Sequence, residues 1–480
     1  MGSWLAPRME TAVLWSCPDR RRCRPWSDSR IPVREVGPVA QNKGERRLVL
    51  EGSGQIDPAS LASYRDRGGY QALQQAVLER NPKEVLDEVE RAGLRGRGGA
   101  GFPAAAKWRR VAESDAETKF VVANAYDADP SSPIGRTLLG QNPHRVIEGL
   151  LLAAYAVGAG QAFIYLAADS PKIYERVAKA LGQAREAGLL GDRIAGSRFS
   201  CEVFLSRAWG GFVAGEETAV LAAIQGARAT PEQKPPYPTE WGLFGKPTVV
   251  NSAETLASVP WIISQGADAF ATLGTERSHG TKVVALNVEG QPSRVLEVEL
   301  GTPLRALIEL ATAKQGNGHS PKAVQVGGPT GGFLPESLWD TPLDYETLTE
   351  AGCLMGSGSL IVLPRETCLV GRAAAALTYL SGEACGKCVP CRLGTKRMAG
   401  LLEGIVSGLG RDEDLELLEE LSTTVSDGSL CGFGIGAPNP FRTSLRYFPE
   451  DYRTHLEDGR CPTVQGQHMR ARRYERREVL

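Results

Sequence analysis

The sequence predicts a layered α/β region, followed by a small α+β insert and a mainly helical region. A helical pattern near residues 70–91 opens the first part. Runs typical of buried strands at 120–124 and 162–166 then alternate with helical patterns at 144–157 and 171–187. Such alternation is typical of a sheet that is covered by helices.

The pattern changes twice after this region. Residues 282–288 and 294–300 have the pattern of short strands, and 303–313 that of a helix, which indicates a separate α+β unit at about 281–365. Beyond about residue 366, leucines recur at helical intervals. This period predicts packed helices up to the last cysteine.

Composition excludes several classes of protein. The 480 residues carry 55 Lys and Arg against 56 Asp and Glu, so the net charge of −1 excludes a bulk electrostatic nucleic-acid binder. A hydrophobic content of 42% is typical of a cored globular protein rather than a disordered one. The most apolar stretch, 146–159, is interrupted by Glu148, which predicts a buried helix and not a membrane span.

The two ends of the chain have a different character. Residues 1–46 show no helical or strand period, and we expect a disordered leader there rather than a partner-binding arm; Met9 is an alternative start. Residues 462–480 form a basic tail. The N-terminus lacks the apolar core of a secretion signal, so we expect a cytoplasmic protein with reduced cysteines.

Four of the ten cysteines have the spacing of a cluster site. Cys385, Cys388 and Cys391 form a C-x2-C-x2-C run, and Cys431 lies in a glycine-rich turn further on. Three thiolates on one loop and a remote fourth are typical of a [4Fe–4S] cluster. Zinc on four thiolates remains the alternative, although zinc usually takes paired knuckles. Cys368 is the less favoured fourth ligand, because it is expected on a helix as a core residue.

Two further motifs could bind an anion or a sugar. The run Gly96–Arg97–Gly98–Gly99 frees backbone N–H groups to face an anion, and Lys107 could add a positive charge. Its spacing is neither that of a Rossmann turn nor that of a Walker A loop, so a structural turn remains open. Glu216 and Glu217 follow Gly215 at the start of an expected helix, where they could contact a ligand or serve only as caps.

Together, these motifs resemble the NADH-oxidising flavoprotein subunit of respiratory complex I. The same subunit type occurs in NAD-reducing and electron-bifurcating hydrogenases and in NAD-dependent formate dehydrogenases. The resemblance runs from about residue 46 to residue 461. It rests on ordered blocks: GLRGRGGAGFPA at 93–104 with KW at 107–108, GEET at 215–218, KPPYP at 234–238, GKPT at 245–248 with Asn251, GGP at 327–329, MGSG at 355–358, and the cysteine set. The block after Cys431 looks more like the soluble relatives than like complex I.

The resemblance implies a Rossmann-like FMN and NADH domain, a ubiquitin-like β-grasp (SLBB) insert and a C-terminal four-helix iron–sulfur domain. The implied division is 1–46 leader, 47–275 FMN/NAD-binding domain, 276–365 β-grasp domain, 366–461 helical [4Fe–4S] domain and 462–480 tail. It also implies hydride transfer from NAD(H) to FMN and then one-electron transfer to the cluster, with no acid–base catalytic residue. The implied partners are a thioredoxin-like [2Fe–2S] subunit and a larger iron–sulfur subunit, with peripheral membrane association possible only through them.

The resemblance also assigns residues to the cofactors. The implied FMN contacts are Gly96, Arg97, Gly98, Gly99, Lys107, Asn124, Glu216, Glu217 and Asn251. Asp129 and Gly215 are further implied cofactor contacts, without assignment to one of the two nucleotides. The implied nucleotide contacts are Phe102, Phe212, Lys234 and Tyr237, together with Glu217. The implied cluster ligands are Cys385, Cys388, Cys391 and Cys431.

Four positions depart from the family pattern. Tyr126 replaces an Asp expected near the flavin, Asp127 shortens a Glu, Ser252 replaces an Asn, and Phe333 replaces a common Cys. Each lost polar contact is worth on the order of 1 kcal/mol, so several together could weaken FMN binding about a hundredfold. A flavin-poor paralogue that conducts electrons or acts as a scaffold is therefore the alternative function. A zinc-stabilised binding module is a third.

Overall fold

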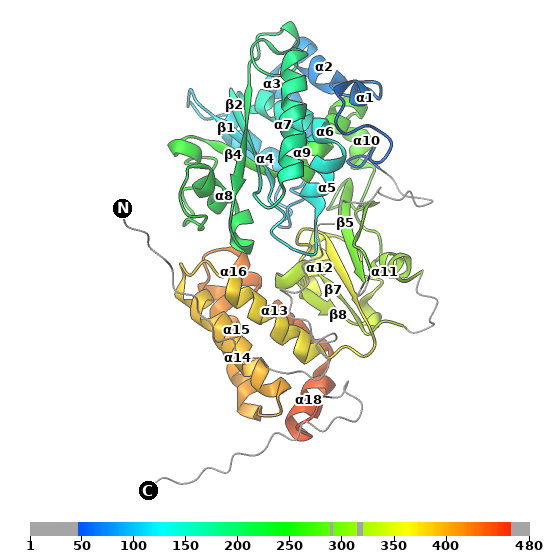
Figure 1. The fold of residues 1–480 in the computed structure, drawn as a ribbon, viewed down its shortest axis with the longest axis vertical. Helices are drawn as coiled ribbons and strands as arrows, with labels where there is room; N and C mark the ends of the chain where they lie inside the picture. The colour runs from blue at the N-terminus through cyan, green and yellow to red at the C-terminus, as the bar shows by residue number, and fades with distance from the viewer. Residues whose placement is uncertain (1–46, 289–290, 314–319, 462–480) are drawn as a thin grey trace.

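The computed structural model describes residues 47–288, 291–313 and 320–461. The predictions for residues 1–46 and 462–480 lie outside the described residues. In Figure 1, a four-stranded sheet and its helices occupy the upper half of the molecule. A five-stranded sheet lies below it on the right, and the helices that carry the cysteine run lie at the lower left.

The elements follow one another along the chain as α1 (Leu61–Arg65), α2 (Gln71–Glu79), α3 (Pro82–Arg91), α4 (Ala104–Ala112), β1 (Phe120–Ala125), α5 (Ile134–Gln141), α6 (Pro143–Val157), β2 (Gln161–Ala167), α7 (Pro171–Glu186), β3 (Glu202–Ala208), α8 (Glu217–Ile224), β4 (Thr248–Ser252), α9 (Ala253–Gln265), α10 (Ala267–Ala271), β5 (Thr281–Val288), β6 (Arg294–Glu299), α11 (Leu304–Thr312), β7 (Ala323–Val326), β8 (Gly332–Leu334), α12 (Tyr345–Glu350), β9 (Ser359–Leu363), α13 (Leu369–Glu383), α14 (Thr395–Val406), α15 (Asp412–Gly428), α16 (Gly432–Gly436), α17 (Asn439–Tyr447) and α18 (Pro449–Glu457). Short 3-10 turns and one π-helical turn, Pro390–Gly394, connect some of them.

The first sheet is parallel throughout, in the order β3-β2-β1-β4. Successive residues of β1 face opposite layers: Val121 and Ala123 pack on one side, and Phe120 and Val122 on the other. The parallel sheet confirms the predicted α/β class. Because the chain leaves β1 toward β2 on one side and returns as β4 on the other, the carboxyl ends of β1 and β4 form the switch point at which open α/β sheets bind ligands.

Helix α6 lies close to α9 because of one glycine. A Cβ on Gly149 would lie 1.9 Å from the carbonyl oxygen of Leu256, so no other residue fits at this crossing. Both helices are almost entirely buried. They form part of the layer that holds the carboxyl edge of the sheet in place.

Among the differences between the sequence predictions and the fold, two have a clear local reason. The helix expected at 70–91 is two helices, because Asn81 caps α3 with a reciprocal bond to Glu84 and Pro82 occupies its first turn. Strands β3 and β4 are absent from the sequence prediction. In β3 only Val203 is buried, so its pattern lacks the apolar run by which β1 and β2 are recognised.

The second sheet has the order β6-β5-β9-β7-β8 and mixes parallel and antiparallel pairs. It also holds the start of the described chain. Glu297 on β6 is fully buried, and its carboxylate accepts the backbone N–H groups of Leu48, Val49 and Leu50 at 2.8–3.0 Å. Residues 249 positions apart are thus joined in one core.

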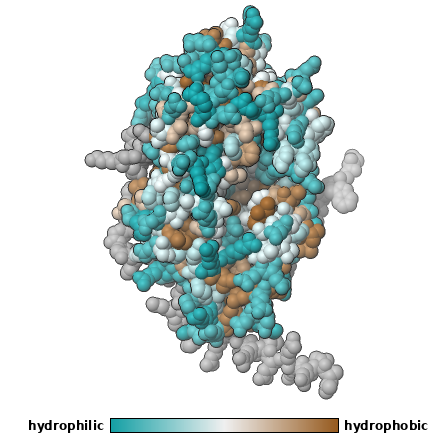
Figure 2. Space-filling model, turned by 180° about the vertical axis from the view of Figure 1, so that it is seen from behind, coloured by the Kyte–Doolittle hydropathy of each residue, from teal (hydrophilic) through white to brown (hydrophobic). Residues whose placement is uncertain are grey.

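Helices α13 to α18 form the third part, around an apolar core that includes Leu377, Met398 and Leu402. Figure 2 shows the molecule from behind, with apolar surface around mid-height and below. Among the described residues, no helix combines the length and the apolar character needed to cross a membrane.

Candidate functional site

The predicted binding residues gather at the carboxyl edge of the first sheet. Asn124 lies one residue before the end of β1, and its amide donates to the Gly215 carbonyl at 2.9 Å. Asn251 lies on the neighbouring strand β4, and its amide oxygen accepts the indole N–H of Trp108 at 2.8 Å. These bonds join the edge of the sheet to the start of α8 and to α4. Ligands of open α/β sheets bind in this position.

The glycine-rich run forms a tight loop over this edge. A Cβ on Gly98 would lie 3.6 Å from that of Ser252 at the end of β4. Gly99 has φ +127°, and a Cβ there would lie 3.1 Å from the backbone of Gly356. The Gly96 N–H donates to the Phe102 carbonyl at 2.8 Å and closes the loop. The loop therefore needs glycine for its close backbone approach.

Arg97 on this loop carries unpaired donors inside the protein. Its side chain is 1% exposed, and one terminal nitrogen donates to the His279 carbonyl at 2.6 Å. Its Nε and its other terminal nitrogen have no hydrogen-bond partner among the described residues. Because unpaired donors on a buried cation are costly, this arrangement fits an anionic ligand such as a phosphate. The predicted flavin phosphate is of this chemical class.

Four charged side chains form a network at the start of α8. Glu217 pairs with Lys107 and, at 2.8 Å, with Lys234, which also binds Glu216 at 3.0 Å. Burial opposes ionisation of Glu217, but the two lysines outweigh it and lower its pKa. Burial likewise opposes the charge of Lys234, whose pKa its two carboxylate partners raise. Lys107 is thus paired with a carboxylate and is not a free charge beside the glycine loop.

Aromatic rings border the network. Phe102 is 46% exposed, and the Lys107 ammonium lies 5.9 Å from its centroid. Tyr237 is 44% exposed and faces the guanidinium of Arg110. Exposed rings beside a charged crevice suit the stacking of a planar ligand. Phe212 instead points toward the helical part, with its ring 5.6 Å from that of Phe433.

Asp129 is fully occupied by the protein. One carboxylate oxygen accepts from the backbone and side chain of Ser131, and the other accepts from the hydroxyls of Ser357 and Ser359. The carboxylate therefore joins the loop after β1 to the start of β9. Its assignment as a direct cofactor contact stays a prediction, and the bonds give it a positioning function as well.

The four patterned cysteines converge at the near end of the helical part. Cys385 and Cys388 follow α13, Cys391 lies in the π-helical turn, and Cys431 precedes α16. Burial, and then the sulfurs of Cys388, Cys431 and Cys385, raise the pKa of Cys391 to about 12. Burial also raises the pKa of Cys431, while the N–H groups of Phe433 and Gly434 facing its sulfur oppose the rise. N–H donors around sulfur are typical of cluster ligands.

The spacing of the four sulfurs fits a cluster better than a single ion. Sulfurs that share one tetrahedral zinc lie roughly 3.8 Å apart. Among the described residues, no three of these four cysteines have ligand atoms that all lie within 4.8 Å of one another. A [4Fe–4S] cube separates its ligands more widely, which favours the cluster over the zinc alternative.

Comparisons with known proteins match both the α/β part and the helical part of the chain. Residues 89–261 match the Nuo51 FMN-binding domain, and 372–455 match the NADH-ubiquinone oxidoreductase-F iron-sulfur binding region. The chain is 41% identical to the NADP-reducing hydrogenase subunit HndC of Solidesulfovibrio fructosivorans, over 88% of this chain and 85% of the relative. It is 37% identical to an F-type subunit of NADH-quinone oxidoreductase from Rhizobium meliloti, over 84% of this chain and 96% of the relative.

The chain belongs to the F-type flavoprotein subunits of NADH-quinone oxidoreductase. A solved NAD+-reducing [NiFe]-hydrogenase has a similar fold, with a TM-score of 0.73 and 31% identity over 82% of this chain and 66% of that one. The predicted resemblance is thus confirmed. The chain is an NADH dehydrogenase flavoprotein subunit, in which electrons pass from NADH through FMN to an iron–sulfur cluster.

The departures from the pattern of these flavoprotein subunits all have partners within the protein. The Tyr126 ring stacks on Tyr165, and its hydroxyl donates to the Gly210 carbonyl at 2.6 Å. Ser252 caps α9, and Phe333 is fully buried on β8. Asp127 accepts the N–H groups of Gly135 and Arg136 at 2.7 Å, and burial raises its pKa to about 6.

Two residues of the flavoprotein site escape sequence reasoning. The hydroxyl of Thr255 accepts the backbone N–H of Arg97 at 2.9 Å, and the Ser252-x-x-Thr255 cap is a local signal for it. Glu383 accepts the Phe212 N–H at 2.6 Å from 171 residues away. No local pattern reveals this second contact.

Proposed function

We propose that this subunit works as the diaphorase of a multisubunit oxidoreductase, and that the carboxyl edge of the first sheet is its flavin and nucleotide crevice. The observation that carries the proposal is the buried Arg97 of the glycine loop, whose Nε and one terminal nitrogen have no hydrogen-bond partner among the described residues. The Glu216–Glu217–Lys234 network at the start of α8 supports it. FMN, when bound, supplies the conversion of a two-electron hydride into single electrons.

The residues of the crevice bind and orient. The glycine loop and Arg97 hold the flavin phosphate, because they supply N–H donors and a positive charge. Lys107 and Lys234 keep Glu217 ionised, so that its remaining lone pairs can accept bonds from ribose hydroxyls. Phe102 and Tyr237 stack on the nicotinamide nucleotide, which fixes its orientation for hydride transfer.

The four cysteines hold a [4Fe–4S] cluster close to this crevice. Phe212, which follows β3, contacts Phe433, which lies two residues beyond Cys431. The segment after β3 and the cysteine loop are therefore in direct contact, through this ring pair and through bonds such as that from Arg228 to the Cys385 carbonyl. This proximity supports passage of electrons from the crevice to the cluster.

The finer fold and partner assignments are part of the same proposal. We assign the mixed five-stranded sheet with α11 to a β-grasp (SLBB) unit. We assign α13, α14, α15 and α17, with the short α16 and the terminal α18 attached, to the four-helix iron–sulfur domain. Val389, Leu393 and Ile435 lie beside the cysteines and are about half exposed. This apolar surface suits docking of a larger iron–sulfur subunit, alongside a thioredoxin-like [2Fe–2S] subunit, in a cytoplasmic assembly.

A flavin-poor scaffold or electron-conducting subunit is the second candidate. It is favoured by Tyr126 and Ser252, whose polar groups bind the protein itself rather than face an open pocket. This candidate predicts a chain with four irons and no bound flavin.

The deciding experiment is anaerobic purification of the full chain, reconstitution with FMN, iron and sulfide, and measurement of NADH-dependent ferricyanide reduction. We expect activity that falls about tenfold in kcat/KM in Glu217→Gln, because the substitution removes the charge held by both lysines. Glu202→Gln, which alters a surface pair with Arg185, is the matched control. Absence of both bound flavin and activity, with four irons retained, would instead establish the scaffold.

A further inference from the structure

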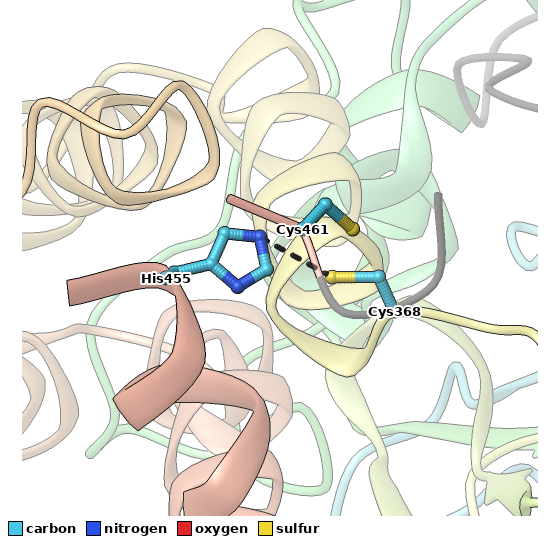
Figure 3. A group of neighbouring side chains, drawn as sticks. All are labelled: Cys368, His455 and Cys461. Atoms are coloured by element: carbon cyan, nitrogen blue, oxygen red, sulfur yellow. Dashed lines mark hydrogen bonds between the residues drawn. The ribbon is translucent and has the colours of Figure 1, made fainter. Parts of the chain in front are cut away.

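A second group of sulfur and nitrogen ligands lies away from the four cysteines. Figure 3 shows Cys368, His455 and Cys461 with their side chains directed toward one another. Their ligand atoms all lie within 4.8 Å of one another. Cys368 caps the start of α13, His455 lies on α18, and Cys461 follows that helix. Three separate chain positions thus meet at one point.

The imidazole is oriented as a metal ligand. Its Nδ1 lies 2.8 Å from the carbonyl oxygen of Asp451, which can only accept, so Nδ1 carries the hydrogen. The lone pair of Nε2 then faces the sulfur of Cys368 at 3.8 Å. Metal-binding histidines characteristically donate their second ring nitrogen in this way. The imidazole is also 1% exposed, which limits competition from water.

The sulfur of Cys368 accepts a backbone hydrogen bond that would support a thiolate. The N–H of Gly371, in the first turn of α13, donates to it at 3.3 Å, and the N-terminus of this 15-residue helix adds a favourable dipole.

The carboxylate of Asp451 is not available as a ligand. Lys322 pairs with both of its oxygens at 2.7–2.9 Å, and the Leu369 N–H donates to one of them at 2.9 Å. The donor set is therefore two thiols and one imidazole.

We propose that Cys368, His455 and Cys461 bind one Zn²⁺ ion, with a water molecule in the fourth position. In a tetrahedral zinc site, neighbouring sulfur and nitrogen ligands lie roughly 3.6 Å apart, which is close to the observed 3.8 Å. Mixed thiolate and imidazole donors in tetrahedral arrangement are typical of zinc. Binding releases the two thiol protons and changes no oxidation state.

The ion would fasten the end of the helical part to its beginning. Cys368 lies directly after β9 and the second sheet, whereas His455 and Cys461 lie at the last described helix. A bound ion would therefore restrain α18 against α13. The site is separate from the predicted cluster, so the two metals are expected to be lost independently.

The test is metal analysis of the full chain, purified anaerobically with its cluster. We expect one zinc beside four irons in the wild type, and zinc X-ray absorption with two sulfur ligands at about 2.3 Å and a nitrogen at about 2.0 Å. Cys461→Ser and His455→Gln should each retain less than a fifth of the zinc and all of the iron. Cys201→Ala, a buried thiol elsewhere in the α/β core, should retain both.

Chelation separates loss of the ion from loss of the fold. Treating the wild type with a zinc chelator should remove one zinc, leave the iron, and lower the thermal midpoint of unfolding by several degrees; zinc alone should restore it. A wild type without zinc that also fails to take up added Zn²⁺ would overturn the proposal. So would a Cys368–Cys461 disulfide found by mass spectrometry in the anaerobic protein, or zinc that stays bound in the double variant C368S/C461S.

Discussion

The crevice at the first sheet and the four-cysteine loop differ in how their charged groups are stabilised before a cofactor binds. In the crevice, Glu216, Glu217, Lys107 and Lys234 already bind one another. In the cysteine loop, burial and neighbouring sulfurs raise the pKa of Cys391, so a bound cation is needed to stabilise its thiolate. The crevice is thus organised by its own side chains, whereas the loop depends on the cluster for its final arrangement.

The largest expected effect, and the strongest test of this difference between the crevice and the cysteine loop, is at Cys388. We expect Cys388→Ser to lose most of the iron and at least 100-fold in electron transfer to partner subunits, because a cube with three ligands is poorly held. NADH–ferricyanide activity at the crevice should stay within threefold of the wild type. Cys353→Ala, a buried thiol outside the loop, is the control for iron content. Equal loss of both activities would show that the crevice also depends on the cluster.

The crevice is tested at Arg97, whose buried donors lack partners among the described residues. Arg97→Ala should raise the dissociation constant of FMN 10- to 100-fold, since a charge-assisted bond is worth about 1.5–3 kcal/mol. Flavin fluorescence titration measures this, and iron content should not change. Arg305→Ala, which breaks a surface pair with Asp340, serves as the control. Unchanged FMN affinity in Arg97→Ala would contradict the proposal that Arg97 binds the FMN phosphate.

Acid should distinguish the α/β part from the helical part. Burial lowers the pKa of His144, which contacts Tyr70 and Gln183, to about 4, against about 6.5 in an unfolded chain. The unfolded state then binds more protons between pH 6.5 and 4, so stability falls as the pH falls through this window. We expect a loss of about 1 kcal/mol between pH 7 and 5.5.

His144→Gln should flatten this part of the pH profile. Urea unfolding followed by tryptophan fluorescence at several pH values measures the slope, because Trp108 lies in the same core as the helix of His144. Asp127 opposes the trend, since its raised pKa makes stability fall as the pH rises from about 4 to about 6. The variant D127N should therefore make the loss of stability at acid pH steeper. Identical profiles of stability against pH in the two variants would contradict the opposite effects assigned to His144 and Asp127.

The smallest expected effect concerns the ring pair that joins the two regions. Phe212→Leu should slow electron passage from NADH to the cluster two- to threefold, through looser packing against Phe433. Stopped-flow absorbance of cluster reduction measures this rate. Phe212→Tyr keeps the ring and should restore it. A loss of FMN in the leucine variant would mean that the ring belongs to the crevice rather than to the link.

Local sequence patterns predict more of the fold than of the contacts. Strand β1 and helices α6 and α7 are predictable because their apolar periods are continuous. Strand β4 escapes prediction because five residues, Thr248–Ser252, are too few for a period to stand out.

The candidate site shows the same difference between adjacent residues, which the sequence reveals, and distant contacts, which it does not. The glycine loop and the Glu216–Glu217 pair are visible in the sequence because their residues are adjacent. The bonds of Asp129 to Ser357 and Ser359 join residues about 230 positions apart, which no local pattern can reveal. Cys368 has the sequence context of a core residue, although it meets His455 and Cys461 in the folded chain.

The buried Glu297 has a consequence for synthesis of the protein. The N–H groups of residues 48–50 find their acceptor only on β6, so this segment emerges from the ribosome long before its partner. At roughly 5–20 residues per second, the wait is on the order of 10 to 50 seconds. During that interval the three N–H groups lack their carboxylate acceptor, so this segment can reach its final hydrogen bonding only after residue 297 has been synthesised.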